Sequence, residues 1–379
     1  MQICYWCPFL THIATINAVK NSAISLKKYS KNSQNSKIKI LNSFGEWNFY
    51  KNNSDDIVVH DLQKFNFHKT MPKEGFLLSR LTFLTIFFLN FIPLIKFIKK
   101  EKPDFLIIHL LTILPIILSP FLSKNTKVIL RISGLPKMHF VRSFFWKFFS
   151  KFIYQITTPT NLTKEFLINK KIFNEKKIRV LRDPIINYKN ININKKEIIN
   201  DLPTVNQFYL SVGRLTAQKN FGFLIRHFAK NINKFNIKKL IIVGSGEEFQ
   251  NLKKLILDNN AQDNIFLLGF KKNIYPYLNK CSALISTSNY EDPGFALIEA
   301  CFLKKKVISS IVNNGPLEMY KSSENMCYFY NNNNEVDFIN KIIISEKDNR
   351  SKYKNLRAIK YVKEFTLFSH YKNLNNLIR

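Results

Sequence analysis

The chain has 379 residues, of which 46% are hydrophobic and 22% charged, and this excludes wholesale disorder and fits two or three domains. Its 10 glycines and 13 prolines exclude a collagen-like or linker-dominated architecture. A net charge of +32 indicates an anionic partner, either nucleic acid, acidic lipid or a phosphorylated substrate, although the abundance of Lys, Asn and Ile accounts for part of it.

The N-terminus predicts a first strand that ends in a small-residue Cys4-x-x-Cys7 pair. The alternative, half a zinc site, lacks a second pair to complete it. An odd number of scattered cysteines argues against a disulfide framework and favours a reducing cytosol. These are Cys4, Cys7, Cys281, Cys301 and Cys327. We expect no secretory signal, because no basic start followed by an apolar core opens the chain.

Two apolar segments follow. Phe76–Ile98 contains Arg80, Asn90, Pro93 and Lys96, and predicts a helix packed in a soluble domain. Phe105–Leu122 has 18 residues without a formal charge, which is the minimum for a transmembrane helix. Its first four residues favour a buried parallel strand, and Pro115 can then open a helix. A spanning helix over Phe105–Leu122 remains the alternative.

Phe140–Tyr154 predicts a helix with an aromatic face and a basic face. One hypothesis is a core helix whose basic face is solvated. The other is a helix lying in an anionic membrane interface. From Pro93 to Lys151 the sequence has 11 Lys and Arg but only 2 Asp and Glu. Both hypotheses stay open at this point.

The polar stretch Asn187–Asp201 predicts a linker. We therefore expect a first domain over 1–190, a second over 204–350, and a C-terminal helix in 351–379 that returns to the first. Strands are predicted at Lys37–Leu41, Phe105–Ile108, Lys127–Ile132, Phe208–Val212, Leu240–Val243, Ile265–Leu268, Ala283–Ser286 and Val307–Ile311. Helices are predicted at Asn220–Ala229, Phe249–Asp258, Ile274–Lys280 and Phe295–Leu303.

Strands that alternate with helices are typical of parallel sheets covered on both faces. The fold class is therefore predicted as α/β, with two Rossmann-like, doubly wound domains that face each other across a cleft. In such sheets ligands bind at the carboxyl ends of the strands.

Two cations follow the strand Phe208–Val212. Arg214 and Lys219 lie between its carboxyl end and the next helix, where a diphosphate could meet both charges and free backbone N–H groups. The alternative is a solvated basic turn. Gly244-Ser245-Gly246 follows the next strand, but Phe249 replaces the third glycine of a dinucleotide fingerprint, which argues against a dehydrogenase. Either a ligand or another backbone approaches that turn closely.

The segment Tyr290–Ala300 carries the most informative pattern. Pro293 suits the first turn of a helix, which leaves the N–H groups of Gly294, Phe295 and Ala296 able to bind an anion. Glu291 precedes the helix. Glu299 lies within it among apolar residues, where a carboxylate is costly unless it is partnered, and sugar or ribose hydroxyls are suitable donors. The alternative is a capping acid followed by an exposed helical glutamate.

Four motifs occur in a familiar order: VGRL-x3-KN from Val212, VGSGEE from Val243, EDPGFALIE from Glu291 and NGPLE from Asn314. Together they resemble a retaining glycosyltransferase of the GT-B fold, glycosyltransferase family 4 (group 1). The resemblance implies that Arg214 and Lys219 hold the donor diphosphate, Glu299 the ribose and Glu291 the transferred sugar. It places phosphate or sugar oxygens on the Gly294–Ala296 amides.

The same resemblance implies that the turns at Gly244, Gly269 and Phe270 border the base, and that neither a metal nor another cofactor is needed. In the N-terminal half, Pro103–His109 is similar to the family's strand whose terminal histidine points toward the transferred sugar. His109 is thus a second catalytic candidate. Acceptor-side candidates are His12, Arg131 and Ser133. Two departures are Pro8–His12, where relatives have a glycine pair, and Lys304 and Lys306, where relatives have Gly and Pro.

We expect a cytoplasmic enzyme, peripheral on the inner face of the cytoplasmic membrane. It would move a sugar from a nucleotide-diphosphate sugar to a saccharide or lipid-linked acceptor in surface polysaccharide or lipopolysaccharide synthesis, without nucleic acid as a partner. The alternatives are a sugar-nucleotide epimerase on the same fold, a basic nucleic-acid-binding protein, and a membrane-spanning protein.

Overall fold

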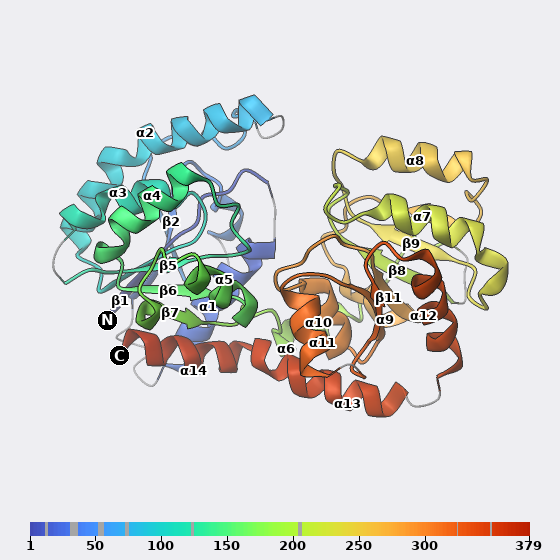
Figure 1. Cartoon of the computed structure of the whole chain (residues 1–379). Coiled ribbons are helices and arrows are strands. Elements are labelled where there is room, and N and C mark those ends of the chain that lie inside the picture. Colours follow the sequence, from blue (N-terminus) through green and yellow to red (C-terminus); the bar gives the residue numbers. More distant parts are fainter. Residues whose placement is uncertain are drawn as a thin grey trace. The chain divides into compact units, whose positions relative to one another are not determined.

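The computed structural model describes residues 1–11, 14–30, 37–51, 57–72, 76–122, 125–203, 207–323, 325–348 and 351–379. The chain forms two units. Unit 1 comprises Met1–Pro184 and Leu367–Arg379, and unit 2 comprises Ile185–Thr366. Figure 1 shows both units with their elements labelled.

Unit 1 contains a seven-stranded sheet in the order β3-β2-β1-β4-β5-β6-β7, in which every pair is parallel. The strands are β1 (Gln2–Trp6), β2 (Lys37–Asn42), β3 (Val58–Asp61), β4 (Phe105–Ile108), β5 (Lys127–Arg131), β6 (Gln155–Thr158) and β7 (Ile178–Val180). The central strands read as continuous apolar runs because helices cover both faces of the sheet.

Alternate residues of each strand enter different layers. Cys4 and Trp6 face a core shared with α2 (Phe76–Glu101), α3 (Ile113–Leu118), α4 (Phe140–Phe149) and α5 (Asn161–Asn169). Ile3, Tyr5 and Cys7 face the opposite core, shared with α1 (Ala14–Tyr29) and α14 (Leu367–Ile378). Short 3-10 turns are η2 (Asn48–Tyr50), η3 (Ser119–Phe121), η4 (Ser150–Phe152), η5 (Glu175–Lys177), η6 (Ile232–Lys234) and η7 (Lys363–Phe365).

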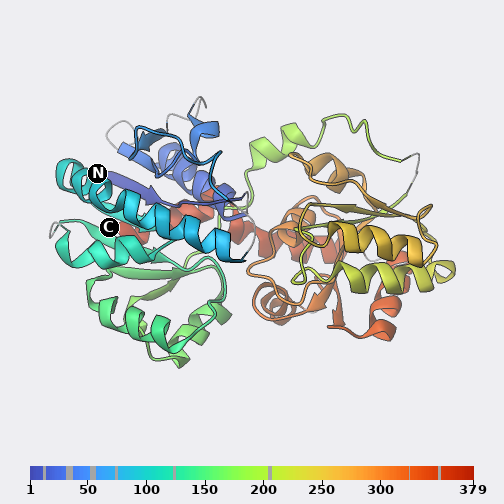
Figure 2. The same cartoon turned by 90° about the horizontal axis from the view of Figure 1, so that it is seen from above.

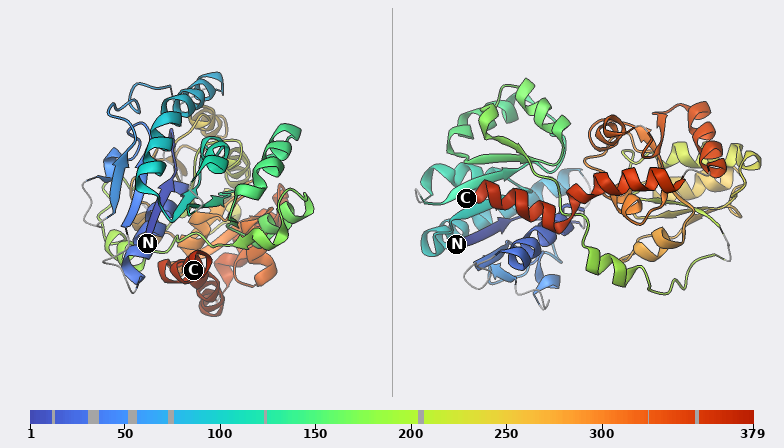
Figure 3. Two further views of the ribbon diagram at one scale, coloured as in Figure 1. Left: turned by 90° about the vertical axis from the view of Figure 1, so that its left-hand side faces the viewer. Right: turned by 90° about the horizontal axis from the view of Figure 1, so that it is seen from below.

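The last helix, α14, is part of unit 1 and packs on α1 (Figure 3). A buried hydrogen-bond chain fixes it. The Ser22 hydroxyl lies 2.8 Å from both the Tyr5 hydroxyl and His370 Nε2, and His370 Nδ1 donates to the Arg182 carbonyl at 2.6 Å. Burial keeps His370 neutral, so with Nδ1 as the donor Nε2 accepts a hydrogen bond from the Ser22 hydroxyl.

Unit 2 contains a six-stranded parallel sheet in the order β10-β9-β8-β11-β12-β13. Its strands are β8 (Tyr209–Val212), β9 (Leu240–Val243), β10 (Ile265–Leu267), β11 (Ala283–Ser286), β12 (Lys306–Ile311) and β13 (Tyr328–Asn331). Its helices are α6 (Tyr188–Asn194), α7 (Phe221–Lys230), α8 (Phe249–Asp258), α9 (Tyr275–Lys280), α10 (Phe295–Phe302), α11 (Gly315–Ser322), α12 (Glu335–Lys347) and α13 (Ser351–Val362). Helices α7, α8 and α12 share one core of this sheet, and α9, α10, α11 and α13 share the other.

Two sequence interpretations need correction. The predicted linker Asn187–Asp201 includes helix α6, whose Ile191 is fully buried in the core of unit 2. Phe105–Leu122 is not one helix: it contains strand β4, the six-residue helix α3 and the turn η3. The strand predicted at Phe105–Ile108 is confirmed, and its four residues are buried.

Helix α10 ends with a strained residue. Lys304, which stands where relatives have glycine, has a φ of +60° in the left-handed region. Because a side chain in this conformation costs free energy that glycine does not pay, Lys304→Gly should raise the free energy of unfolding by about 1 kcal/mol. Urea unfolding measures the change. Lys253→Gly in the middle of α8 should instead lower it by about 1 kcal/mol. A loss of stability in the Lys304 variant contradicts the strain.

The buried His370 makes the stability of unit 1 dependent on pH. Burial lowers its pKa from 6.5 to about 3. As pH falls below about 6.5, the unfolded chain takes up a proton that the folded chain refuses, so unfolding becomes easier. His370→Gln should remove about 2 kcal/mol of the stability difference between about pH 7 and pH 5.

Tryptophan fluorescence can follow this unfolding, because the chain's three tryptophans, Trp6, Trp47 and Trp146, all lie in unit 1. The exposed His139 provides the matched control, and His139→Gln should keep the wild-type pH dependence. If the free energy of unfolding of His370→Gln depends on pH as strongly as that of wild type, His370 is not the group responsible.

Candidate functional site

Three loops of unit 2 meet at the carboxyl edge of its sheet. The loop after β8 bonds to the loop after β9, with Gly213 N donating to Val243 O at 3.1 Å and Leu215 N to Ser245 O at 2.9 Å. Gly244 N in turn donates to Gly269 O, after β10, at 2.9 Å. Backbone hydrogen bonds therefore join the three loops into one surface.

The glycines of the VGSG motif allow this contact. A Cβ on Gly244 would overlap the carbonyl oxygen of Gly213, and one on Gly246 would overlap the backbone of Leu215. The partner that approaches this turn is therefore another backbone, which was one of the two possibilities left by the sequence. The loop after β8, which carries Arg214, is held in place by it.

An ion pair joins this surface to the loop after β11. Lys219 Nζ contacts Glu291 Oε1, and the Ser288 hydroxyl donates to the same oxygen at 2.7 Å. Glu291 is buried, with 8% of its surface exposed. Asn289 N also donates to Gln218 O at 2.8 Å. The two residues that the sequence assigns to diphosphate and sugar thus contact each other.

Helix α10 begins beside this ion pair. Gly294 has a φ of +91° in the left-handed region, and the chain enters the helix without a side-chain cap. The first N–H groups of a helix have no partner inside it and carry its positive dipole end. The backbone of Gly315, where a Cβ would overlap Pro293 O, packs against the turn before the helix. Gly294, Phe295 and Ala296 therefore present amides suited to an oxyanion.

Glu299 lies one to two turns further along α10. It accepts a hydrogen bond from the Tyr275 hydroxyl at 2.9 Å. Burial raises its pKa to about 7, and this hydrogen bond opposes the rise. The alternative of an exposed helical glutamate is wrong, because Glu299 is half-buried and partnered. Tyr275 and Ser288 were both missed from the sequence, since neither belongs to a motif.

Two predicted donor contacts point to solvent. Arg214 is exposed, and within the described residues its guanidinium makes no hydrogen bond or ion pair. Phe270 is 64% exposed, directly after Gly269. An exposed cation and an exposed ring beside the joined loops can contact a ligand without first breaking an internal bond.

The remaining candidate site residues belong to unit 1. His109 directly follows β4, is buried and has no partner for Nδ1 among the described residues. Burial, and next the charge of Arg131, lowers its pKa well below 6.5. The neutral ring can accept or donate one hydrogen bond at Nδ1. Together with Arg131 and His370 it lines a small cavity of about 10 Å³, large enough for about one water molecule.

Arg131 has internal partners that the sequence did not indicate. Its guanidinium donates to Asp183 Oδ1 at 2.5 Å and to the Leu181 carbonyl at 2.6 Å, and it is 3% exposed. This buried pair binds the segment after β7 to β5. The Ser133 hydroxyl is buried without a partner among the described residues. His12 lies outside the described residues. Acceptor contacts of His12, Arg131 and Ser133 stay predictions.

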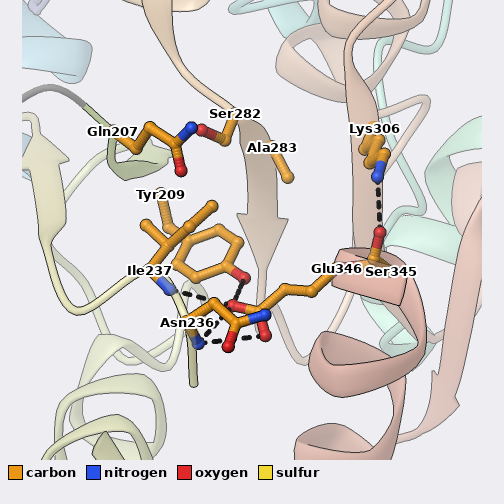
Figure 4. Close-up of a pocket in the computed structure, with 9 residues that line it drawn as sticks. All are labelled: Gln207, Tyr209, Asn236, Ile237, Ser282, Ala283, Lys306, Ser345 and Glu346. Carbon is orange, nitrogen blue, oxygen red and sulfur yellow. Dashed lines mark hydrogen bonds between the residues drawn. The ribbon is translucent and has the colours of Figure 1, made fainter. Parts of the chain in front are cut away.

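A second pocket of about 250 Å³ lies at the opposite, amino edge of the unit 2 sheet (Figure 4). Glu346 occupies its centre and is already satisfied by the Tyr209 hydroxyl at 2.7 Å and the Asn236 and Ile237 amides at 3.0 Å. Lys306 donates to the Ser345 carbonyl. These polar groups of the pocket are therefore engaged in hydrogen bonds within the protein. In the described residues, no group of three or more His, Cys, Asp and Glu side chains could hold a metal ion.

Residues 192–364 match the family model described as glycosyl transferases group 1, and this segment lies inside unit 2. An uncharacterised glycosyltransferase of Methanocaldococcus jannaschii is 30% identical over 269 residues, 65% of this chain and 63% of that protein. A Campylobacter jejuni protein named N-acetylgalactosamine-N,N'-diacetylbacillosaminyl-diphospho-undecaprenol 4-alpha-N-acetylgalactosaminyltransferase is 26% identical over 240 residues, 61% of this chain and 64% of that protein. The chain thus spans a little under two thirds of each relative's length.

Solved structures match nearly the whole chain. Anabaena HepE, crystallised with UDP, gives a TM-score of 0.70 at 12% identity and covers 99% of both chains. Sucrose-phosphate synthase of Thermosynechococcus elongatus gives 0.76 at 14% identity, covering 99% of this chain and 98% of that chain. At such identities the likeness shows the fold alone. The predicted fold class, two parallel-sheet α/β domains of the GT-B type, is confirmed, and residues 192–364 are similar to group 1 glycosyl transferases.

Proposed function

We propose that the chain is a metal-independent, retaining glycosyltransferase that moves a sugar from a nucleotide-diphosphate sugar to an acceptor hydroxyl. One observation carries the proposal: two cations, the N-terminus of α10 and the half-buried Glu299 belong to one edge of the unit 2 sheet. A diphosphate suits the cations and the helix end, and a ribose suits the carboxylate.

The reaction that fits these groups needs no protein nucleophile. The bond from the anomeric carbon to the diphosphate oxygen breaks, and a bond to the acceptor oxygen forms on the same face. The acceptor proton passes to the departing diphosphate. Arg214, Lys219 and the α10 amides stabilise the negative charge that develops on the leaving group. Glu291 orients the transferred sugar, and the catalytic role of His109 stays a prediction.

The wider setting is also part of the proposal. The acceptor is a saccharide or a lipid-linked sugar in bacterial surface polysaccharide or lipopolysaccharide synthesis, and the enzyme lies on the inner face of the cytoplasmic membrane. The name of the Campylobacter relative, which contains a diphospho-undecaprenol acceptor, supports a lipid-linked substrate. An apolar surface on unit 1, described below, favours a membrane partner over nucleic acid.

The ion pair allows a test in which two variants move in opposite directions. Arg214→Ala should weaken binding of the preferred nucleotide, UDP or GDP, by about 1.5–3 kcal/mol, the range for hydrogen bonds to charged groups. Glu291→Gln should tighten it, because a negative charge is removed beside the diphosphate and Lys219 is released. Both variants should lose transfer. Calorimetry and a transfer assay measure the two effects.

Lys219→Ala should weaken binding similarly and also lower the melting temperature, because it leaves the buried Glu291 without its cation. Lys253→Ala, an equal loss of charge on the exposed side of α8, is the matched control and should change neither property. The diphosphate lies elsewhere if Arg214→Ala and Lys253→Ala bind the nucleotide equally well.

The raised pKa of Glu299 predicts how nucleotide affinity depends on pH. Only the carboxylate can accept hydrogen bonds from both ribose hydroxyls, and below about pH 7 burial keeps this group protonated. Affinity should therefore fall as pH drops from about 8 to 6, by up to about tenfold per pH unit. Glu299→Gln should lose this dependence.

Titration of the nucleotide's own phosphate changes the affinity of wild type and of Glu299→Gln equally, so it cancels when the two proteins are compared. The 2'-deoxy nucleotide supplies a second check. It should bind wild type more weakly than the ribose nucleotide does. In Glu299→Gln the difference in affinity between the two nucleotides should be smaller. Glu299 does not contact the ribose if wild type and Glu299→Gln show the same dependence of nucleotide affinity on pH and the same difference in affinity between the ribose and 2'-deoxy nucleotides.

A further inference from the structure

Helix α2 has an apolar surface on both of its sides. Its inward stripe is buried in unit 1: Ile86 packs with Leu10 and Phe44 at 1% exposure, and Leu94 packs in the larger core at 0%. Its outward side is equally apolar but open to solvent: Leu84, Phe88 and Ile92 are 54%, 70% and 60% exposed. A helix that is apolar all round requires an apolar environment on both sides. The protein supplies only one.

Helix α4 adds to the same outward surface. Phe140, Phe144 and Phe148 are 85%, 65% and 55% exposed, whereas Trp146 is turned inward at 7%. The hypothesis of a core helix with a solvated basic face is therefore wrong for much of the aromatic face, because Phe144 and Phe148 are exposed and only Phe145 and Phe149 are half-buried against the core. Phe121, in η3, is 75% exposed.

These exposed residues form one surface, which we call the α2–α4 face. The inward residues of α2, α3 and α4 all join one core, so the three helices lie on the same side of the sheet and their outer sides point away from it. Figure 1 shows them together, and Figure 2 shows α2 as the outermost layer when unit 1 is seen from above. Exposed apolar residues gathered on one side of a domain in this way indicate an interaction site.

The composition of α2 alone would allow it to cross a bilayer. The most apolar 18-residue window of Leu78–Glu101 has a mean hydropathy of 2.0, and 33% of that window is buried inside the protein. Its packing argues against crossing. Asn90, Leu94 and Ile98 lie at 0–1% exposure against the sheet, so withdrawing the helix would open the core of unit 1. Only the outward half of α2 is available to lipid.

The charges around the face identify the partner. From Phe76 to Phe152 the sequence has 12 Lys and Arg and two acidic residues. Lys96, Lys147 and Lys151 are exposed on the helices themselves, and Lys151 Nζ lies 5.0 Å from the Phe152 ring. Apolar side chains bordered by cations match the acyl region and the anionic headgroups of a bilayer. A second copy of the chain would bring like charges together, since a twofold interface pairs a patch with itself.

We propose that the α2–α4 face rests in the interface of an anionic lipid bilayer, with the outward side of α2 buried at headgroup depth and the lysines on the headgroups. The inference concerns a surface of unit 1 and stands independently of the sugar chemistry proposed for unit 2. It makes α2, which the sequence assigns to packing in a soluble domain, the main apolar contact with lipid.

The first test removes apolar area without disturbing the core. Leu84→Ser, Phe88→Ser and Ile92→Ser are combined in one variant of the full chain. Its binding to vesicles of phosphatidylglycerol and phosphatidylcholine should fall about a hundredfold, equivalent to about 2.7 kcal/mol. The matched control combines Leu257→Ser, Val336→Ser and Ile344→Ser, which change exposed residues of unit 2 and should leave binding unchanged. Equal binding of both variants overturns the proposal.

The second test removes charge. Lys147→Glu with Lys151→Glu should reduce binding to the anionic vesicles at least tenfold and should remove most of its salt dependence. Lys253→Glu with Lys254→Glu, an equal change on exposed residues of α8, should not. Binding to pure phosphatidylcholine should be weak in every protein. Strong binding of wild type to the neutral vesicles contradicts the assigned role of the lysines.

The third test locates the contact. All five cysteines are buried, so Phe88→Cys offers the single reactive site for an environment-sensitive dye. Its emission should shift to shorter wavelength on anionic vesicles, whereas a dye on Leu257→Cys should not respond. Retention that survives both carbonate and high salt would show a spanning helix instead. A dimer that the triple serine variant dissolves, without vesicle binding by wild type, would show a second copy on the face. Either result overturns the proposal.

Discussion

The backbone contact between the loops after β8 and β9 determines the geometry of the candidate donor site. Glycines at 244 and 246 leave room for the carbonyls of Gly213 and Leu215, and hydrogen bonds then fix the loop that carries Arg214. The same loop leads to Lys219, which the ion pair with Glu291 ties to the loop before α10. Two cations and a helix N-terminus therefore share one edge of the sheet because backbones, not side chains, set their spacing. Preorganised charge of this kind stabilises a leaving group without a cost of reorganisation at the moment of reaction.

The Lys219–Glu291 pair has two opposite consequences for a bound diphosphate. It holds the lysine in place, so little side-chain entropy is lost when the ligand arrives. It also places a carboxylate beside the phosphates, which weakens the attraction. An arrangement that binds the product diphosphate less tightly than it could releases that product more readily. Arg214 is exposed and unpaired within the described residues, so in the proposed site its charge attracts the diphosphate more strongly than that of Lys219, which Glu291 partly neutralises.

The sequence predicted the parts that depend on local pattern. Strands β9 and β11 and helix α8 coincide with their predicted bounds, since short apolar runs between turns define them. It did not reveal partners that come from distant segments. The acceptor contact expected of Arg131 stays a prediction, and its partner Asp183, 52 residues away in the chain, becomes a neighbour only through the order of β5, β6 and β7. His370 and Tyr275 were missed for the same reason: a lone histidine or tyrosine carries no signal until the fold brings it to Ser22 or Glu299.

Helix α2 shows a further limit of pattern. A helix with apolar residues on every side has no contrast between its faces, so its sequence cannot tell which side meets the core. The structure shows that Asn90 and Thr82, the polar residues, face inward, while Leu84, Phe88 and Ile92 face outward. This arrangement is unfavourable in water, because burying each side chain of this size would contribute about 1.5–3 kcal/mol of stabilising free energy. In α4, Trp146 is buried and Phe145 and Phe149 are half-buried against the same core, whereas Phe140, Phe144 and Phe148 are exposed. A surface that is costly in water, lies on two helices of one domain, is bordered by lysines and is nearly free of acids is the physical basis for proposing an anionic bilayer as its partner.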